Sequence, residues 1–317
     1  MITVLAGGVG AARFLEGLYI VHPPEEITVI SNVGDDLEIY GVHVSPDIDI
    51  VMYTVAGLID PRGWGVVNDT FHFVDSLERF GVEVWFRLGD RDLATSVFRT
   101  RRLAEGAALS AVTDEIRRAL GLRFRLIPVT DQPLRTKVST TAGKLDFQDY
   151  FVRRRQADEV LKVTFEGTGK SKAAPGVLKA IANADAVVLA PSNPVVSIGP
   201  ILAVKGVREA LSETRARVAA ISPIIQGGAI KGPADRMLRS LGMESSALQV
   251  AKMYQDFLDL FVLDVADATL ADQVAELDIE PLVTETVMRD IQAKRNLAAA
   301  TLSALGLPPD GRGAHSR

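Results

Sequence analysis

The chain has 317 residues, of which 47% are hydrophobic and 24% are charged, with no cysteine and a formal net charge of −5 at pH 7. This length suits one large α/β domain, or a large domain with a smaller one attached. The lack of cysteine excludes a disulfide framework, a thiolate nucleophile and cysteine-ligated zinc. No long basic run or long apolar run is present, so we expect neither a nucleic-acid nor a membrane partner. Met1 leads directly into a strand-like segment, and we expect a cytoplasmic protein.

Short apolar runs alternate with longer amphipathic stretches, which is typical of β-α units around a largely parallel sheet. Strands that are Val-, Ile- and Leu-rich without alternation are expected to be buried on both faces. The expected strands are Ile2–Leu5, Ile27–Ser31, Ala186–Leu189, Val218–Ser222 and Leu260–Leu263. The expected helices are Ala11–Val21, Val74–Phe80, Leu109–Leu120, Gly176–Ala182, Val204–Leu211, Pro233–Leu241, Ser246–Phe257 and Val283–Leu305.

The middle of the chain has a different pattern. Phe124–Val129, Lys137–Thr140, Lys144–Phe147 and Leu161–Phe165 are typical of antiparallel strands or hairpins, with a turn at Ala142-Gly143. The predicted fold class is therefore α/β: a Rossmann-like three-layer α/β/α core with a mainly parallel sheet, formed by residues 1–103 and 170–305. Residues 104–169 are expected to form a smaller inserted α+β subdomain, and residues 306–317 a disordered tail.

A glycine-rich turn joins the first expected strand to the first expected helix. It reads Ala6-Gly7-Gly8-Val9-Gly10-Ala11-Ala12-Arg13. Glycines let a backbone approach a ligand, and the free N–H groups at a helix N-terminus attract phosphate. The dinucleotide fingerprint requires Gly or Ala where Arg13 stands, which weakens the case for NAD binding. A tight structural turn without a ligand is the alternative.

Acidic residues follow the second expected strand. The first group is Asn32-Val33-Gly34-Asp35-Asp36, and the second is Ser45-Pro46-Asp47-Ile48-Asp49. Clustered carboxylates repel one another, so they indicate a cation, a proton or ligand hydroxyls between them. A Mg²⁺-assisted phosphoryl transfer would use them, because the metal neutralises charge on the transferred group. Turn formation and helix capping are the structural alternatives.

Two further segments are candidates for ligand contact. Pro191-Ser192-Asn193-Pro194, followed by Ser197, comes directly after an expected strand, where α/β proteins bind ligands. Arg87-Leu88-Gly89-Asp90-Arg91-Asp92 alternates charges around a glycine. An arginine there matches the geometry of phosphate or carboxylate, and a local salt-bridge network is the alternative.

Taken in this order, the motifs resemble those of the 2-phospho-L-lactate transferase (CofD-like) family, which acts in biosynthesis of the deazaflavin coenzyme F-420. The resemblance runs from Met1 to about Asp264 and more weakly through the final helix. It rests on Gly7–Gly10, Asn32–Asp36, Ser45–Asp49, Trp64-Gly65, Asn68–Phe71, Leu88–Asp92, Phe147–Asp149, Ala190–Gly199, Ser222–Ile225 and Tyr254–Phe257. Ser96 departs from the pattern, since many members carry His there.

The resemblance implies a homodimeric transferase. Such an enzyme moves a 2-phospholactyl-type group, whose acid is lactate, enolpyruvate or glycerate, from a guanosine-diphospho donor to the deazaflavin Fo. GMP leaves, and Mg²⁺ assists. The implied residues are Asp35, Asp36 and Asp49 for catalysis; Asn32, Asp49 and Arg87 for the deazaflavin; Asp35, Asp36 and Asp47 for the metal; and Gly8, Gly10, Ser192, Asn193, Pro194 and Ser197 for the nucleotide.

Two other functions compete with this one. A non-catalytic regulatory protein that binds a nucleotide or sugar nucleotide would use the same fold. An NAD(P)-dependent oxidoreductase is the second, and Arg13 argues against it. Binding of an anion alone would not favour four nearby carboxylates, so Asp35, Asp36, Asp47 and Asp49 favour the enzyme.

Overall fold

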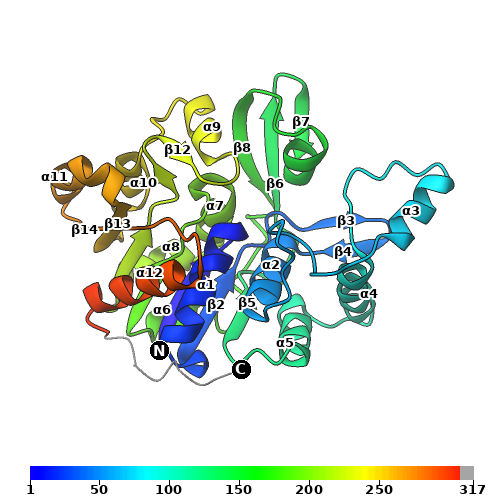
Figure 1. The fold of residues 1–317 in the computed structure, drawn as a ribbon, viewed down its shortest axis with the longest axis horizontal. Helices are drawn as coiled ribbons and strands as arrows, with labels where there is room; N and C mark the ends of the chain where they lie inside the picture. The colour runs from blue at the N-terminus through cyan, green and yellow to red at the C-terminus, as the bar shows by residue number, and fades with distance from the viewer. Residues whose placement is uncertain (308–317) are drawn as a thin grey trace.

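The computed structural model describes residues 1–307, and their centre is a seven-stranded parallel sheet (Figure 1). The strand order is β14-β13-β10-β9-β1-β2-β5, and each neighbouring pair is parallel. The strands are β1 (Ile2–Ala6), β2 (Ile27–Ser31), β5 (Arg125–Pro128), β9 (Ala186–Leu189), β10 (Arg217–Ile221), β13 (Leu260–Asp264) and β14 (Glu280–Thr284). The predicted α/β class with a mainly parallel sheet is confirmed.

The strands at the centre of the sheet are apolar because helices cover both faces. Every residue of β1, β2, β9 and β13 is buried. On one face α1 (Gly8–Val21) packs between α2 (Pro46–Val55) and α12 (Ile291–Ala304). On the other, α6 (Val177–Ala182) packs against α8 (Val207–Glu213).

The strand order reverses at the middle of the sheet. From β1 the chain moves to β2 on one side, whereas from β9 it moves to β10, β13 and β14 on the other. Right-handed crossovers then place the connecting helices on opposite faces. The loops after β1 and β9 diverge at this point, and the crevice between them is the usual ligand site of an open α/β sheet.

A three-stranded antiparallel sheet stands beside the central one (Figure 1). It consists of β7 (Gly143–Asp146), β6 (Arg135–Thr140) and β8 (Val160–Glu166), which confirms the predicted hairpins. The prediction for Phe124–Val129 is wrong, because β5 pairs in parallel with β2 at the edge of the central sheet. Its apolar residues pack against α5 (Leu109–Ala119), and its pairing with the distant β2 is a contact that a short apolar run does not reveal.

An arm projects at the right in Figure 1, beside the antiparallel sheet. It contains the hairpin of β3 (Leu37–Ile39) and β4 (Val42–Val44) with α3 (His72–Arg79) and α4 (Asp90–Ala104) (Figure 1). Val42, Val44, Val74 and Leu88 form a small core of its own. This arm was not predicted as a unit, since its strands have three residues each.

The C-terminal part differs from the prediction at one point. Val283–Leu305 was expected to be a helix, but Val283 and Thr284 end β14, and α12 begins at Ile291. Asp290 caps that helix by accepting a hydrogen bond from the N–H of Ala293. The predicted disordered tail, residues 306–317, lies outside the described residues from 308 onward.

The remaining elements are short. They are η1 (Pro24–Glu26), η2 (Asp149–Arg153), η3 (Pro194–Ile198), α7 (Gly199–Ala203), β11 (Ile224–Ile225), β12 (Gly228–Ala229), α9 (Ala234–Ser240), α10 (Ala247–Tyr254), η4 (Val265–Leu270) and α11 (Ala271–Ala275). Among the described residues, no helix has both the length and the apolar character needed to cross a membrane.

Candidate active site

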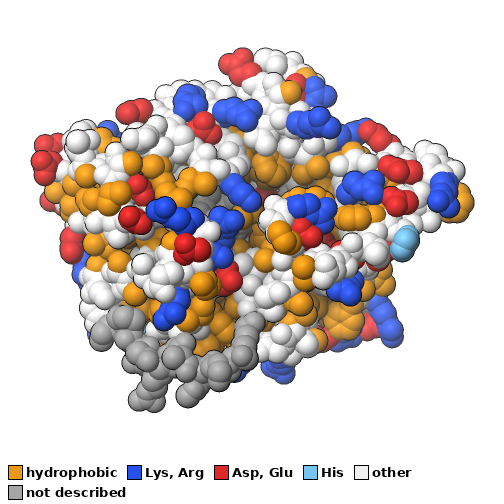
Figure 2. Space-filling view, viewed as in Figure 1, with side chains coloured by type: hydrophobic (Ala, Val, Ile, Leu, Met, Phe, Trp, Pro, Cys, Tyr) orange, Lys and Arg blue, Asp and Glu red, His pale blue; other side chains and the backbone are white. Residues whose placement is uncertain are grey.

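A cavity of about 750 Å³ opens at the carboxyl edge of the central sheet. Its walls begin directly after β1 (Gly7–Gly10), after β9 (Pro191–Asn193) and after β10 (Ser222 and Pro223), and they include Thr286–Arg289 beyond β14. Figure 2 shows a hollow with hydrophobic side chains inside it and Lys and Arg side chains near the centre of the same face. The cavity lies at the point where the strand order reverses.

The glycine turn is shaped by close contacts. A Cβ on Gly10 would lie 2.0 Å from the carbonyl oxygen of Pro191, and a Cβ on Gly7 would lie 2.7 Å from Oδ2 of Asp47. Gly8 has φ +74°, in the left-handed region that favours glycine. No side chain caps α1 from the N-cap position, and Gly8 to Gly10 line the cavity. Burial raises the pKa of Asp47, and a hydrogen bond from the Gly8 backbone offsets part of that rise.

The loop after β9 lies against this turn. Ser192 Oγ accepts a hydrogen bond of 3.3 Å from the N–H of Gly7. Asn193 Oδ1 accepts bonds from Val195 N–H (2.9 Å) and Val196 N–H (3.3 Å), which caps η3. Ser192, Asn193 and Ser197 line the cavity. Pro194, also predicted to bind nucleotide, is the first residue of η3 and does not line it.

Asp35 and Asp47 are two of the carboxyl groups in the cavity wall. Asn32 Nδ2 donates a 2.9 Å hydrogen bond to Asp47 Oδ2. Burial raises the pKa of Asp47 to about 6, although the bond from Asn32 lowers it. Burial also raises the pKa of Asp35 well above its usual value, and the charge of Asp47 raises it further. Oδ1 of Asp35 has no hydrogen-bond partner.

Asp36 and Asn32 support this wall from behind it. Asp36 Oδ2 accepts a 3.0 Å hydrogen bond from Ser45 Oγ and lies 3.0 Å from His43 Nε2. Asn32 is fully buried, and its Oδ1 accepts a 2.7 Å bond from the N–H of Gly34. Both were predicted to contact a ligand or metal, but neither lines the cavity.

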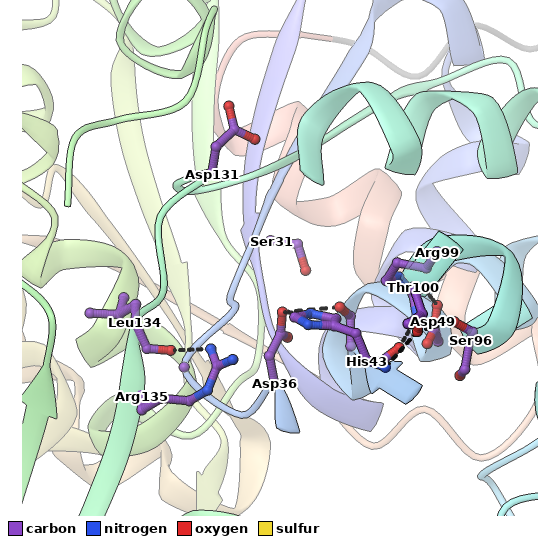
Figure 3. Close-up of polar contacts among 12 residues, drawn as sticks. Ser31, Asp36, His43, Asp49, Ser96, Arg99, Thr100, Asp131, Leu134 and Arg135 are labelled. Atoms are coloured by element: carbon purple, nitrogen blue, oxygen red, sulfur yellow. Dashed lines mark hydrogen bonds and ion pairs between the residues drawn. The ribbon is translucent and has the colours of Figure 1, made fainter. Parts of the chain in front are cut away.

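Asp49 is paired with a buried arginine. It lines the cavity from the first turn of α2, and Arg99 Nη2 of α4 donates to its Oδ1. Arg99 is fully buried. Figure 3 shows His43 between Asp36 and this pair. Burial raises the pKa of Asp49 and the Arg99 charge offsets part of that effect, while Asp49 Oδ2 has no hydrogen-bond partner.

A second carboxyl lies beside the pair. Asp92 Oδ1 accepts a 2.9 Å hydrogen bond from the hydroxyl of Tyr53, and both residues line the cavity. Burial and then the Asp49 charge raise the pKa of Asp92 to about 7. Asp49 and Tyr53 are four residues apart on α2, which places them on one helix face.

Two parts of the cavity wall differ in character. One part is aromatic: Phe147 and Phe151 stack with centroids 5.4 Å apart, and Trp85 and Phe86 line the same cavity. Arg87 also lines it and is held 2.7 Å from Asp75. The wall formed by the loops after β10 and β14 carries Lys231 and Arg289, with Arg13 of α1 bonded to the carbonyl of Met288 (3.3 Å).

Asp35 and Asp47 suit a divalent cation whose remaining coordination positions are filled by a bound ligand. Within residues 1–307, no three or more His, Cys, Asp or Glu side chains are grouped so that they could hold a metal ion by themselves. Mg²⁺ usually binds through one or two carboxylates, with substrate phosphates and water as its other ligands. The unpartnered Oδ1 of Asp35 and its repulsion by Asp47 match such a site, whereas Asp36 lies behind the wall.

The structure thus gathers most of the predicted site residues into one cavity. Those that line it are Gly8, Gly10, Asp35, Asp47, Asp49, Arg87, Ser192, Asn193 and Ser197. Arg99 and Tyr53 were missed. The four-residue spacing from Asp49 could have suggested Tyr53, but no local signal marks Arg99, which lies fifty residues from its partner.

Comparison with known proteins identifies the family of the chain. The family model 2-phospho-L-lactate transferase CofD matches residues 2–303. A phosphoenolpyruvate transferase of Streptomyces griseus is 42% identical over 95% of this chain and 97% of its own length. A 2-phospho-L-lactate transferase of Methanothermobacter thermautotrophicus is 41% identical over 96% of this chain and 98% of its own length.

A solved structure also shares the fold. A UPF0052 family protein from Bacillus halodurans superposes with a TM-score of 0.56 at 19% identity, over 97% of this chain and 90% of that one. The family model and the curated relatives, each spanning nearly the whole chain, show that this chain belongs to the 2-phospho-L-lactate transferase CofD family.

Proposed function

We propose that the chain transfers a 2-phospho-acid group from a guanosine-diphospho donor to a hydroxyl of the deazaflavin Fo, with release of GMP. The observation that carries this proposal is that one cavity contains a glycine turn at a helix N-terminus, two carboxylates suited to a metal, and an aromatic wall. Names of close relatives add the class of group transferred, since they are phosphoenolpyruvate and 2-phospho-L-lactate transferases.

The donor binds at the end of the cavity formed by the loops after β1, β9, β10 and β14. The first turn of α1, Gly8 to Gly10, lines this space together with Ser192 and Asn193. Arg13, Lys231 and Arg289 supply positive charge for a diphosphate and a carboxylate. A nucleotide diphosphate linked to an acid is the kind of anion that this wall favours.

The acceptor binds at the aromatic end. The faces of Phe147, Phe151, Trp85 and Phe86 provide apolar surface for a planar ring. Arg87 lies on the same wall for polar groups of the ring. Asp49 presents an unpartnered carboxylate oxygen, which can accept a hydrogen bond from a ribityl hydroxyl.

Asp35 and Asp47 would hold Mg²⁺ between these two ends. When bound, the ion neutralises charge on the transferred phosphate and orients it. Asn32 keeps Asp47 in place through its 2.9 Å hydrogen bond, and Asp36 fixes Ser45 at the start of α2. These two residues therefore position the ligands rather than contact the substrate.

The transfer requires alignment more than a covalent intermediate on the protein. The acceptor hydroxyl oxygen forms a bond to the phosphorus that carries the acid. The bond from that phosphorus to the bridging oxygen breaks, and the oxygen leaves with GMP. The hydroxyl proton passes to Asp49 or to solvent. Arg99 favours the ionised form of Asp49, which can accept a hydrogen bond.

The donor assay should compare acids, because relatives that carry the two names are 42% and 41% identical to the chain. We would incubate the protein with Fo, Mg²⁺ and guanosine-diphospho donors of enolpyruvate, lactate and glycerate, and follow products by mass spectrometry. The expected result is a deazaflavin that has gained a phospho-acid, together with GMP. If no donor gives product while Fo or GDP binds, the protein is a binding protein instead.

Asp49→Asn tests the assigned role. It removes the charge but keeps the size of the side chain, and we expect kcat to fall by about 10²-fold or more. Asp131→Asn is the matched control, because Asp131 bonds Ser110 at the start of α5 and does not line the cavity. Equal activity in the Asp49→Asn variant and the wild type would contradict the role.

A further inference from the structure

The donor end of the cavity is held by two carboxylates that do not line it. Asp264 is the last residue of β13 and is buried. Its Oδ2 accepts hydrogen bonds of 2.8 Å from both the N–H and the hydroxyl of Thr286. Its Oδ1 accepts one of 3.0 Å from the N–H of Ala266. Burial alone would raise the pKa of Asp264, but these bonds outweigh it and lower the pKa.

Thr286 begins the part of the cavity wall that follows β14. β13 and β14 pair in register from Leu260 to Asp264, so the strand bonds end at Thr284. The bonds from Asp264 extend this connection by two residues beyond the sheet. The segment that follows, Val287 to Arg289, lines the donor end, and the Met288 carbonyl accepts the bond from Arg13.

Asp267 makes a similar connection to the neighbouring loop. Both of its carboxylate oxygens accept from the N–H of Gln226, at 3.1 and 3.0 Å. Gln226 has φ 48°, an uncommon backbone conformation for a residue other than glycine. It forms the turn between β11 and β12, after which Ile230 to Ala234 line the cavity.

The two carboxylates belong to one short segment. Asp264 caps η4, and Asp267 lies within it. A cavity wall formed by loops must lose conformational freedom when it binds a ligand, unless bonds within the protein have already ordered it. Charge-assisted bonds to backbone N–H groups are among the stronger ones available for this purpose.

We propose that Asp264 and Asp267 are positioning residues that hold the two loops of the donor end, Thr286–Arg289 and Gln226–Ala234, in their binding conformation. This inference rests on the proposed function, because it assigns that end of the cavity to the donor. It predicts that loss of either carboxylate weakens donor binding and leaves the acceptor end intact.

Asp264→Asn is the direct test. Its amide keeps one oxygen, so its N–H groups must face either the Thr286 donors or the Ala266 N–H, and one of these connections is lost. We expect the KM for the guanosine-diphospho donor to rise about 10-fold, the equivalent of one lost charge-assisted bond. The KM for Fo and kcat should stay within about twofold of wild type. A change of that size is smaller than the loss of a hydrogen bond would cause.

Thr286→Val and Thr286→Ser provide a second, milder test. Valine removes the hydroxyl bond and keeps the N–H bond, whereas serine keeps both, so valine should raise the donor KM more than serine does. This pair keeps the inference testable if Asp264→Asn does not fold. Asp131→Asn is the matched control, since Asp131 also accepts from the N–H and hydroxyl of one residue, Ser110, and neither of them lines the cavity.

Hydrogen–deuterium exchange separates this inference from the proposed function. Faster exchange of residues 286–289 in Asp264→Asn, without change in the Asp131→Asn protein, supports the holding role even if the wild type turns over no guanosine donor. Turnover in the wild type with equal donor KM in Asp264→Asn overturns the inference and leaves the proposed function standing. Unchanged exchange of residues 286–289 in Asp264→Asn likewise overturns it.

Discussion

At the scale of single residues, the site depends on buried carboxyl groups. Asp35, Asp47, Asp49 and Asp92 all line the cavity, and burial raises the pKa of each of them. Asp49 forms an ion pair with the buried Arg99, whose charge also offsets part of the rise in the pKa of Asp92. The Asp47 charge raises the pKa of Asp35, and the Asp49 charge raises that of Asp92. Such repulsion between carboxylates favours binding of a cation or a proton between them.

Asp92→Asn should stabilise the protein at alkaline pH. The pKa of Asp92 is about 7 in the folded state and about 3.9 when unfolded, so the folded state holds a proton that the unfolded state has lost between these values. The stability contributed by that proton is present below the unfolded pKa and is lost as pH rises through 7. Asparagine does not titrate, and its oxygen can still accept the Tyr53 bond.

Urea denaturation at pH 5 and pH 8.5 measures the effect. We expect Asp92→Asn to gain at least about 1 kcal/mol over the wild type at pH 8.5, and less at pH 5. Glu213→Gln, an exposed carboxylate on α8, is the control and should show no such difference. A gain of the same size at both pH values would contradict the assignment.

At the scale of elements, the site is built from the ends of parallel strands. The loops after β1 and β9 lie beside each other because these strands are neighbours, and β2 and β10 flank them. Gly10 allows α1 to begin against the Pro191 carbonyl. Such a contact is between two backbone segments, so neither can move aside as a flexible side chain would.

Gly10→Ala should therefore disturb both stability and nucleotide binding. The new Cβ would lie 2.0 Å from the Pro191 carbonyl oxygen. We expect a loss of about 1–3 kcal/mol in the free energy of unfolding and weaker GDP binding, because α1 must shift. Gly169→Ala is the control, as a Cβ there meets nothing within 4 Å. Wild-type stability in Gly10→Ala would show that the helix adapts without strain.

At the scale of the whole molecule, distant parts of the chain meet in one cavity. Its lining extends from Gly7 to Arg289, and the antiparallel sheet region contributes Phe147 and Phe151. The arm supplies Trp85, Phe86 and Arg87. A ligand that fills the cavity therefore contacts the central sheet and both of its extensions at once.

Ligands should consequently raise the melting temperature. GDP at a hundredfold excess over its Kd would stabilise the fold by about 2.7 kcal/mol. We expect the shift measured by scanning calorimetry to be larger with Mg²⁺ than with EDTA, and the difference to disappear in Asp35→Asn. Asp131→Asn should behave like the wild type. The same shift with and without Mg²⁺ would argue against a metal at Asp35 and Asp47.

The sequence by itself determined the parallel sheet and the positions of the ligand loops. Apolar runs such as Ile2–Leu5 and Ile27–Ser31 are buried on both faces, and the glycine and carboxylate groups follow them directly. These features are local, because strand burial and turn formation depend on neighbours in the chain. The family resemblance arose from the same ordered motifs.

Only the tertiary structure decided which side chains face the cavity. Asp35 lines it while the adjacent Asp36 turns to His43 and Ser45, and Arg99 reaches Asp49 from another helix. The pairing of the edge strand β5 with β2 was likewise visible only in the tertiary structure. Such choices depend on packing between segments far apart in sequence, and no local pattern of residues encodes the partner that a buried charge will meet.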